Sequence, residues 1–221
     1  MESPTLFFSP LGTSKLLQFV MNLVPLLGVI FMDWSVFALM YVFWLETLGL
    51  SFFNGLKIFF AQGGETSGPH FSRALVYILF RGFVLGFYMI FILVFVGVMI
   101  GSKQGEAYEW VSYLVFIDPS FRLTILVFFL AKFIEFIYFY FIKNERKMAK
   151  PEDQGSLFDL RLIIIHVVLV GGVFAYNYFS LWLGNRIGLI TFALVFVIVK
   201  SIVDYFANGD YNFKVLRKNE N

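Results

Sequence analysis

Long apolar stretches separated by short polar segments run through this sequence from its first helix to its last. Of the 221 residues, 59% are hydrophobic and 14% are charged, whereas a soluble domain carries about 25% charged residues. A soluble fold of this size cannot cover so much apolar surface with polar groups, so the chain needs lipid as its solvent. Backbone in lipid must satisfy its own hydrogen bonds, which favours helices. The sequence therefore predicts an all-α integral membrane protein.

Six apolar stretches are long enough to cross a bilayer core of about 30 Å, which takes roughly 20 helical residues. They cover residues 14–31, 35–61, 73–100, 118–142, 160–183 and 187–206. Asp33 and Ser35 are good N-caps for the second stretch, and residues 110–117 are too short to cross and are typical of an interfacial segment. We expect a bundle of about six transmembrane helices that forms one polytopic domain over residues 1–221, with a loosely ordered polar tail at 208–221.

The positions of Lys and Arg predict that both termini are cytoplasmic, because positive charge is retained on that side of the membrane. The inner ends then carry Lys15, Lys57, Arg73, Lys143, Arg146, Lys147, Lys150, Arg161, Lys214, Arg217 and Lys218, and the outer ends carry Lys103, Arg122 and Arg186. Three tryptophans fall near the outer interface as expected anchors: Trp34, Trp110 and Trp182. The N-terminus lacks the pattern of a cleaved secretory signal, so the first stretch is expected to be retained. We expect a multi-pass protein of the cell (inner or plasma) membrane.

Composition excludes several other classes of protein. A net charge of +2 is too small for a surface that neutralises many nucleic-acid phosphates. The absence of cysteine excludes disulfides, thiolate metal sites and cysteine nucleophiles. Neither G-x-S-x-G nor H-E-x-x-H occurs, so hydrolase and zinc-protease motifs are missing.

Ionisable residues inside the predicted helices are the candidates for a functional site, because in hydrocarbon they are costly unless paired or hydrated. They are Glu46, Lys57, Arg81, Lys132, Glu135, His166, Lys200 and Asp204. Counting about 1.5 Å per residue from the inner helix ends places most of them in the cytoplasmic half and Glu46 near the midplane. We hypothesise a polar pocket open to the cytoplasm, with Glu46 at its floor and His166 on its wall.

A structural interpretation of the same residues stays open. The side chains of Lys57, Arg81, Lys200 and Asp204 can snorkel to the inner interface. The spacings of Lys132 with Glu135, and of Lys200 with Asp204, are those at which side chains on one helix meet. Gly82 and Gly86 form a small-xxx-small pair, which can let another helix approach closely.

The segment from Asn22 to Lys57 resembles an uncharacterised family of prokaryotic multi-pass membrane proteins, a domain of unknown function. The resemblance rests on N-L-V-P-L-L-G-V-I-F, D-W-S, F-W-L-E and F-F-N-G-L-K, because the family shows a proline in helix one, a tryptophan before helix two, and Tyr-Trp-x-Glu followed by Asn and Lys. The matching positions are Pro25, Trp34, Trp44, Glu46, Asn54 and Lys57, with Phe43 in place of the tyrosine. Arg161 with His166, and Lys200 with Asp204, are similar to its late motifs. The resemblance implies that Glu46 and His166 matter, without implying a ligand.

Three functions remain possible from the sequence. The leading one is movement or sensing of a small ion, proton or polar solute through the cytoplasm-facing pocket. The second is a structural or assembly subunit of a membrane complex, or a homo-oligomer, whose intramembrane charges pair within it. The third is an intramembrane enzyme, or a metal or haem protein, that uses His166. We expect no cofactor: the other histidine, His70, lies in a loop, and a metal would need carboxylates such as Glu135 or Asp204.

Overall fold

The computed structural model describes residues 23–63, 70–94, 96, 109–153, 167, 171, 174–176 and 178–219, the last range with side chains as far as residue 202. Over these residues the structure is helical, with no strand. Four of its helical stretches are long and apolar enough to cross a membrane, judged by length and composition: Val36–Phe60, Phe71–Val94, Trp110–Ile142 and Asn185–Ile202. The chain divides into two compact units, Ser35–Val173 and Met1–Trp34 with Phe174–Asn221.

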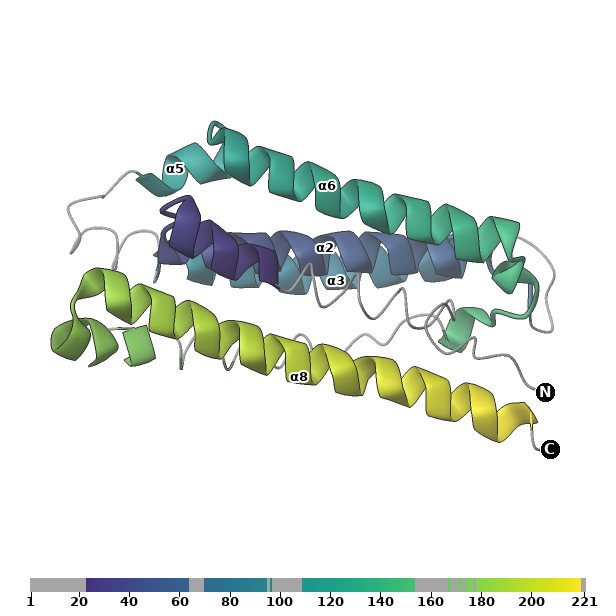
Figure 1. Cartoon of the computed structure of the whole chain (residues 1–221). Coiled ribbons are helices and arrows are strands. Elements are labelled where there is room, and N and C mark those ends of the chain that lie inside the picture. Colours follow the sequence, from purple (N-terminus) through teal and green to yellow (C-terminus); the bar gives the residue numbers. More distant parts are fainter. Residues whose placement is uncertain are drawn as a thin grey trace. The chain divides into compact units, whose positions relative to one another are not determined.

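Helix α2 (Val36–Phe60) is the centre of the first unit, and most of its residues are buried. It begins where the sequence predicts, because the hydroxyl of Ser35 accepts a 3.3 Å hydrogen bond from the amide of Ala38 and so satisfies one of the open donors of the first turn. Of the two predicted caps, Ser35 is therefore the N-cap. Helix α2 packs against both α3 and α6, which run beside it in Figure 1.

Helix α3 (Phe71–Phe91) packs on α2 through one stripe of side chains. Ala74, Tyr77, Arg81 and Leu85 are buried and recur at the three- and four-residue spacing of a helix face. The two helices are antiparallel, since Trp44 of α2 donates from Nε1 to the carbonyl of Leu85 at 2.7 Å, whereas Ile58, further along α2, packs against Ala74 and Tyr77. The other face of α3 is apolar and exposed.

Helix α6 (Pro119–Phe136) runs parallel to α2 and continues as a π-helical segment, η2 (Ile137–Ile142). Asp118 caps its start by accepting a 2.7 Å hydrogen bond from the amide of Phe121, as the sequence predicts. Phe121 stacks on Tyr41 near the start of α2, with ring centroids 5.5 Å apart. Phe136 contacts Phe53 further along both helices, at 5.9 Å. The short helix α5 (Glu109–Leu114) precedes α6, so the predicted interfacial segment forms a separate turn of helix.

The segment after α6 folds back on the link between α2 and α3. It contains the 3₁₀ turns η3 (Glu145–Lys147) and η4 (Pro151–Asp153). The amide of Gln62 donates to the carbonyl of Arg146 at 2.8 Å, and the amide of Gly63 donates to that of Ala149 at 2.9 Å. Arg73 at the start of α3 pairs with Glu152 at 3.2 Å. These contacts bring one end of each of α2, α3 and α6 together.

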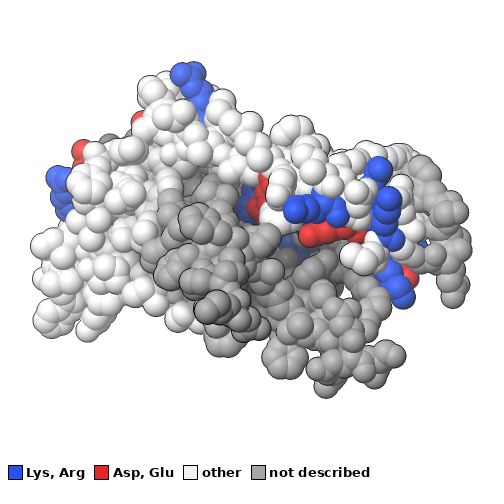
Figure 2. All heavy atoms as spheres, turned by 45° about the vertical axis from the view of Figure 1, so that its right-hand side comes forward, with Lys and Arg blue, Asp and Glu red and all other residues white. Residues whose placement is uncertain are grey.

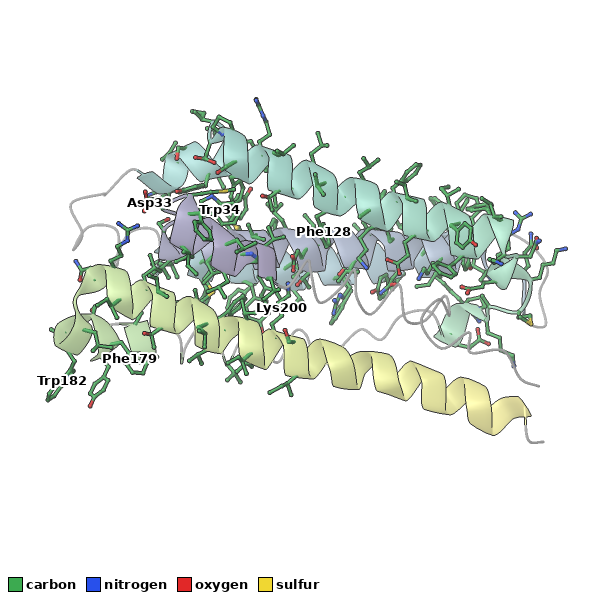
Figure 3. All side chains as sticks on the ribbon, viewed as in Figure 1. Asp33, Trp34, Phe128, Phe179, Trp182 and Lys200 are labelled. Atoms are coloured by element: carbon green, nitrogen blue, oxygen red, sulfur yellow. The ribbon has the colours of Figure 1, made fainter. Side chains whose placement is uncertain are left out.

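The second unit contains the end of the first predicted helix, helical at residues 23–31, and α8 (Asn185–Asn219). Trp34 is 0% exposed and folds over Gly28, so it is a packed side chain rather than the interface anchor that the sequence predicts. Gly184, with φ of 80°, turns the chain into α8, and Trp182, just before this turn, points away from the ribbon in Figure 3.

Helix α8 extends beyond the predicted range of 187–206 and includes residues 208–219, where the sequence predicts a loosely ordered tail. This part contains no proline, and extending an existing helix costs less than starting one. Residues 14–22, 97–100 and most of 160–173 lie outside the described part of the chain, so the count of six spans and the single domain stay predictions.

Candidate functional site

Glu46 is the one acidic residue of α2. It lies near the middle of the helix and is 6% exposed. The midpoint of α2 lies two residues further along, about 3 Å away at the rise of an α-helix. The sequence predicts Glu46 near the centre of a span, and its place in the helix agrees with that prediction. Its burial means that the carboxylate is removed from water at this point of the helix.

Arg81 is the most deeply buried charged residue of α3, at 2% exposed. Its Nε donates a 3.1 Å hydrogen bond to the hydroxyl oxygen of Ser51 on α2. That hydroxyl donates in turn to the carbonyl of Thr47 at 2.8 Å, and the Thr47 hydroxyl donates to the carbonyl of Phe43 at 2.9 Å. Since each hydroxyl gives its proton to its own helix, the oxygen of Ser51 is oriented to accept from Arg81.

This hydrogen bond shows that the guanidinium of Arg81 lies against α2, and the assignment of Arg81 to a pocket stays a prediction. A snorkelling arginine extends along its helix until its charge reaches the interface, whereas Arg81 is buried against the middle of α2. Ser51 lies five residues after Glu46, about 7.5 Å further toward the end of α2 that carries Lys57. The cation and the carboxylate therefore lie at neighbouring levels of one helix pair.

Lys132 and Glu135 form an ion pair on α6, with Nζ and Oε2 2.7 Å apart and both side chains partly buried. The sequence predicts this contact from their spacing, and the structure confirms it. Lys132 lies one turn from Phe128 and one turn from Phe136, the buried residues of α6 that face α2. The pair thus lies at the edge of the contact between α6 and α2.

In the first unit the structure describes five of the predicted candidates: Glu46, Lys57, Arg81, Lys132 and Glu135. Lys57 is half-buried near the end of α2, and its carbonyl accepts a hydrogen bond from the hydroxyl of Tyr140. Lys200 is 4% exposed on α8 of the second unit, where Figure 3 labels it. The side chain of Asp204, and the whole of His166, lie outside the described residues. The pocket that joins all of these stays a prediction.

Two polar residues of the site, Thr47 and Ser51, are absent from the sequence prediction. Their signal is their spacing: Thr47, Ser51 and Gly55 recur every four residues and mark one face of α2. Gly55 lies on the face that contacts Ile78 of α3, where a Cβ would be only 2.5 Å from the isoleucine side chain. A stripe of small and hydroxyl side chains on a buried helix therefore indicates where a second helix, and its arginine, can approach.

Carboxylates and imidazoles do not gather into a metal site in the described part of the chain, where no group of three or more such side chains could hold an ion. The charged groups that the structure describes in the first unit include the buried carboxylate of Glu46, the guanidinium of Arg81 bound to a hydroxyl, and the Lys132–Glu135 pair. Such groups can bind a small ion, exchange a proton or hold helices together.

A family of unknown function, DUF6498, matches residues 10–220. No curated protein matches the chain, and no solved structure does.

Proposed function

We propose that this chain is a multi-pass membrane protein that moves or senses a small ion, proton or polar solute. It belongs to the DUF6498 family, whose function is unknown, so the proposal is argued from the residues of the chain itself. The observation that carries the proposal is the burial of Glu46 in the middle of the apolar helix α2. A buried carboxylate costs free energy that a leucine would not, so its presence is better explained by use than by stability.

The exposed faces of the helices support a place in the membrane. Large apolar side chains are exposed along α3 and α6: Leu75, Val76, Leu79, Phe83, Phe87 and Ile90 on the former, and Leu123, Leu126, Val127, Leu130, Phe133 and Ile134 on the latter. A continuous apolar surface of this extent is unfavourable in water and favourable in lipid. In Figure 2 the charged residues, in blue and red, gather in a few places, and uncharged residues, in white, cover much of the described surface.

The ends of the first unit support an orientation with both termini cytoplasmic. Arg73 and the basic residues between 143 and 150 lie at the end where the segment after α6 meets the α2–α3 link. Arg122 lies at the opposite end of α6. The end richer in positive charge is the cytoplasmic one by the positive-inside rule.

In this function Glu46 binds the cation or proton, and Arg81 supplies a fixed positive charge at a neighbouring level. The hydrogen bond that Arg81 donates to Ser51 holds the guanidinium in one direction, so its charge is already oriented when a solute arrives. The roles of His166, Lys200 and Asp204 stay predictions from the sequence. A carboxylate between apolar helices suits a proton-coupled step, because losing its charge lowers the cost of its burial.

The proposal is tested by flux through the purified chain in sealed vesicles, with Glu46→Gln as the variant. We expect this change to remove most of the flux of the transported ion or solute while the protein remains folded, because it removes the charge and keeps the shape. Glu145→Gln, on an exposed turn, is the matched control and should leave flux unchanged. Folded Glu46→Gln protein with the same flux as the natural chain, across protons, alkali cations, calcium and small anions, would exclude the role of Glu46.

A second function, as an assembly subunit, is favoured by one surface of α3. Gly82 and Gly86 are exposed, and no described atom lies within 4 Å of where their Cβ atoms would be. This face is open to a helix from a partner or a second copy. Gly82→Leu with Gly86→Leu should then break a complex that copurifies with the natural chain, and a complex of unchanged size would argue against this function.

A further inference from the structure

Four basic residues lie among the eight positions that follow η2: Lys143, Arg146, Lys147 and Lys150. We propose that residues 143–150 form a binding surface for the phosphate headgroups of anionic phospholipids. The proposal rests on the membrane location argued above, and it adds a partner of defined chemistry at a surface separate from Glu46. Clusters of Lys and Arg directly beside a membrane-spanning helix attract anionic lipid through charge.

Hydrogen bonds to the α2–α3 link hold the backbone of this surface in place. Asn144, with φ of 58°, turns the chain out of η2. The two hydrogen bonds from Gln62 and Gly63 then tie Arg146 and Ala149 to the α2–α3 link. A Cβ at Gly63 would lie 2.7 Å from the carbonyl carbon of Met148, so the two segments are in direct contact. A fixed backbone keeps the charges together without a large loss of entropy on binding.

Two of the basic side chains lie on aromatic rings at the end of α6. The ammonium of Lys143 is 5.6 Å from the ring centroid of Tyr138, and the guanidinium carbon of Arg146 is 5.1 Å from that of Phe141. Contacts between cations and rings of this kind are typical of a cation held near an apolar boundary. Phosphate therefore meets these charges at the level where the apolar part of α6 ends.

Met148 is the feature that favours a lipid over a soluble phosphate compound. It is 79% exposed and lies between Lys147 and Lys150, which are exposed as well. An exposed apolar side chain that lies between two exposed lysines in sequence fits a bilayer surface, where it can enter the headgroup region while the charges bind phosphates. Free phosphate would give Met148 no such partner.

Acidic residues only partly offset the positive charge of this surface. Glu145 is exposed within it, and Glu152 and Asp153 follow it in sequence. The carboxylate of Glu152 is paired with Arg73 at 3.2 Å. Residues 143–150 therefore keep an excess of positive charge, with four basic residues against one acidic residue.

The test uses the absence of cysteine from the chain. Met148→Cys gives the full chain a single site for a fluorescent label. The labelled protein is reconstituted in phosphatidylcholine bilayers that contain a small share of a nitroxide-labelled lipid. In one sample this lipid is phosphatidylglycerol, and in the parallel sample it is phosphatidylcholine. We expect the anionic lipid to quench the label more strongly. Adding Lys147→Gln and Lys150→Gln should weaken this preference by about fivefold per charge at low salt. These side chains are exposed, so the changes remove no core packing.

Two controls separate the possible failures. Arg122→Gln, at the other end of α6, should leave the preference at position 148 unchanged. A label introduced with Ile117→Cys, also exposed and at that other end, reports membrane contact independently. Equal quenching by both lipids at position 148 would overturn the lipid surface and leave the membrane location intact. No quenching at either position would overturn both the membrane location and the lipid surface. Loss of the preference for anionic lipid on adding inorganic phosphate would assign the surface to a soluble phosphate instead.

Discussion

The Nε of Arg81 and the hydroxyl oxygen of Ser51 lie 3.1 Å apart between α3 and α2, and both side chains are buried. A charged donor without its acceptor in such surroundings is far more costly than a neutral one. The pair therefore explains how an arginine is tolerated in the middle of an apolar helix contact.

Ser51→Ala should destabilise the protein by about 1.5–3 kcal/mol, because it removes a hydrogen bond to a charged group that stays buried. The measurement is the free energy of unfolding in mixed micelles. Ser72→Ala, an exposed serine at the start of α3, is the matched control and should change little. Equal stability of the two variants would mean that Arg81 finds another acceptor when Ser51 is lost.

Gly28→Ala should destabilise the second unit by roughly 1–3 kcal/mol, the usual cost of overpacking a filled site. A Cβ at Gly28 would collide with the indole ring of Trp34, which is fully buried and has no open space to move into. The measurement is the melting temperature of the purified protein.

Gly82→Ala is the control for that substitution, since it adds the same methyl group where nothing described lies within 4 Å. It should stabilise α3 by about 0.5–1 kcal/mol because alanine favours a helix over glycine. If both Gly28→Ala and Gly82→Ala lowered the stability, the local contacts of each glycine and the helix propensity of alanine would not explain the two results.

Sequence reasoning predicted the helices better than their contacts. It located the starts of α2 and α6, because Ser35 and Asp118 carry side chains that cap a first turn. It also predicted the pair Lys132–Glu135, because that spacing lies within one helix. The partner of Arg81 was not predicted, because it depends on how α2 and α3 are aligned. That alignment is set by Trp44, Ser51 and Gly55 together, and no single residue signals it.

Asp33 and Arg186 should show a coupling energy of no more than about 1 kcal/mol in a double-mutant cycle, because their ion pair is exposed. Their charged atoms lie 3.2 Å apart, and both side chains are largely accessible to water. The cycle uses Asp33→Asn and Arg186→Gln, with unfolding measured at low and high salt. Asn keeps the left-handed backbone that Asp33 adopts, with φ of 52°. A coupling that persists in high salt would contradict this account.

Trp44, Ser51 and Gly55 join α2 to α3 at three successive levels, through an indole hydrogen bond, a hydroxyl and close packing of the Ile78 side chain on the glycine. Sliding one helix along the other would break the first two contacts and force a side chain into the third. We expect α2 and α3 to behave as one rigid rod. Any working cycle that alternately opens and closes a route past Glu46 then has to tilt the remaining helices around that rod.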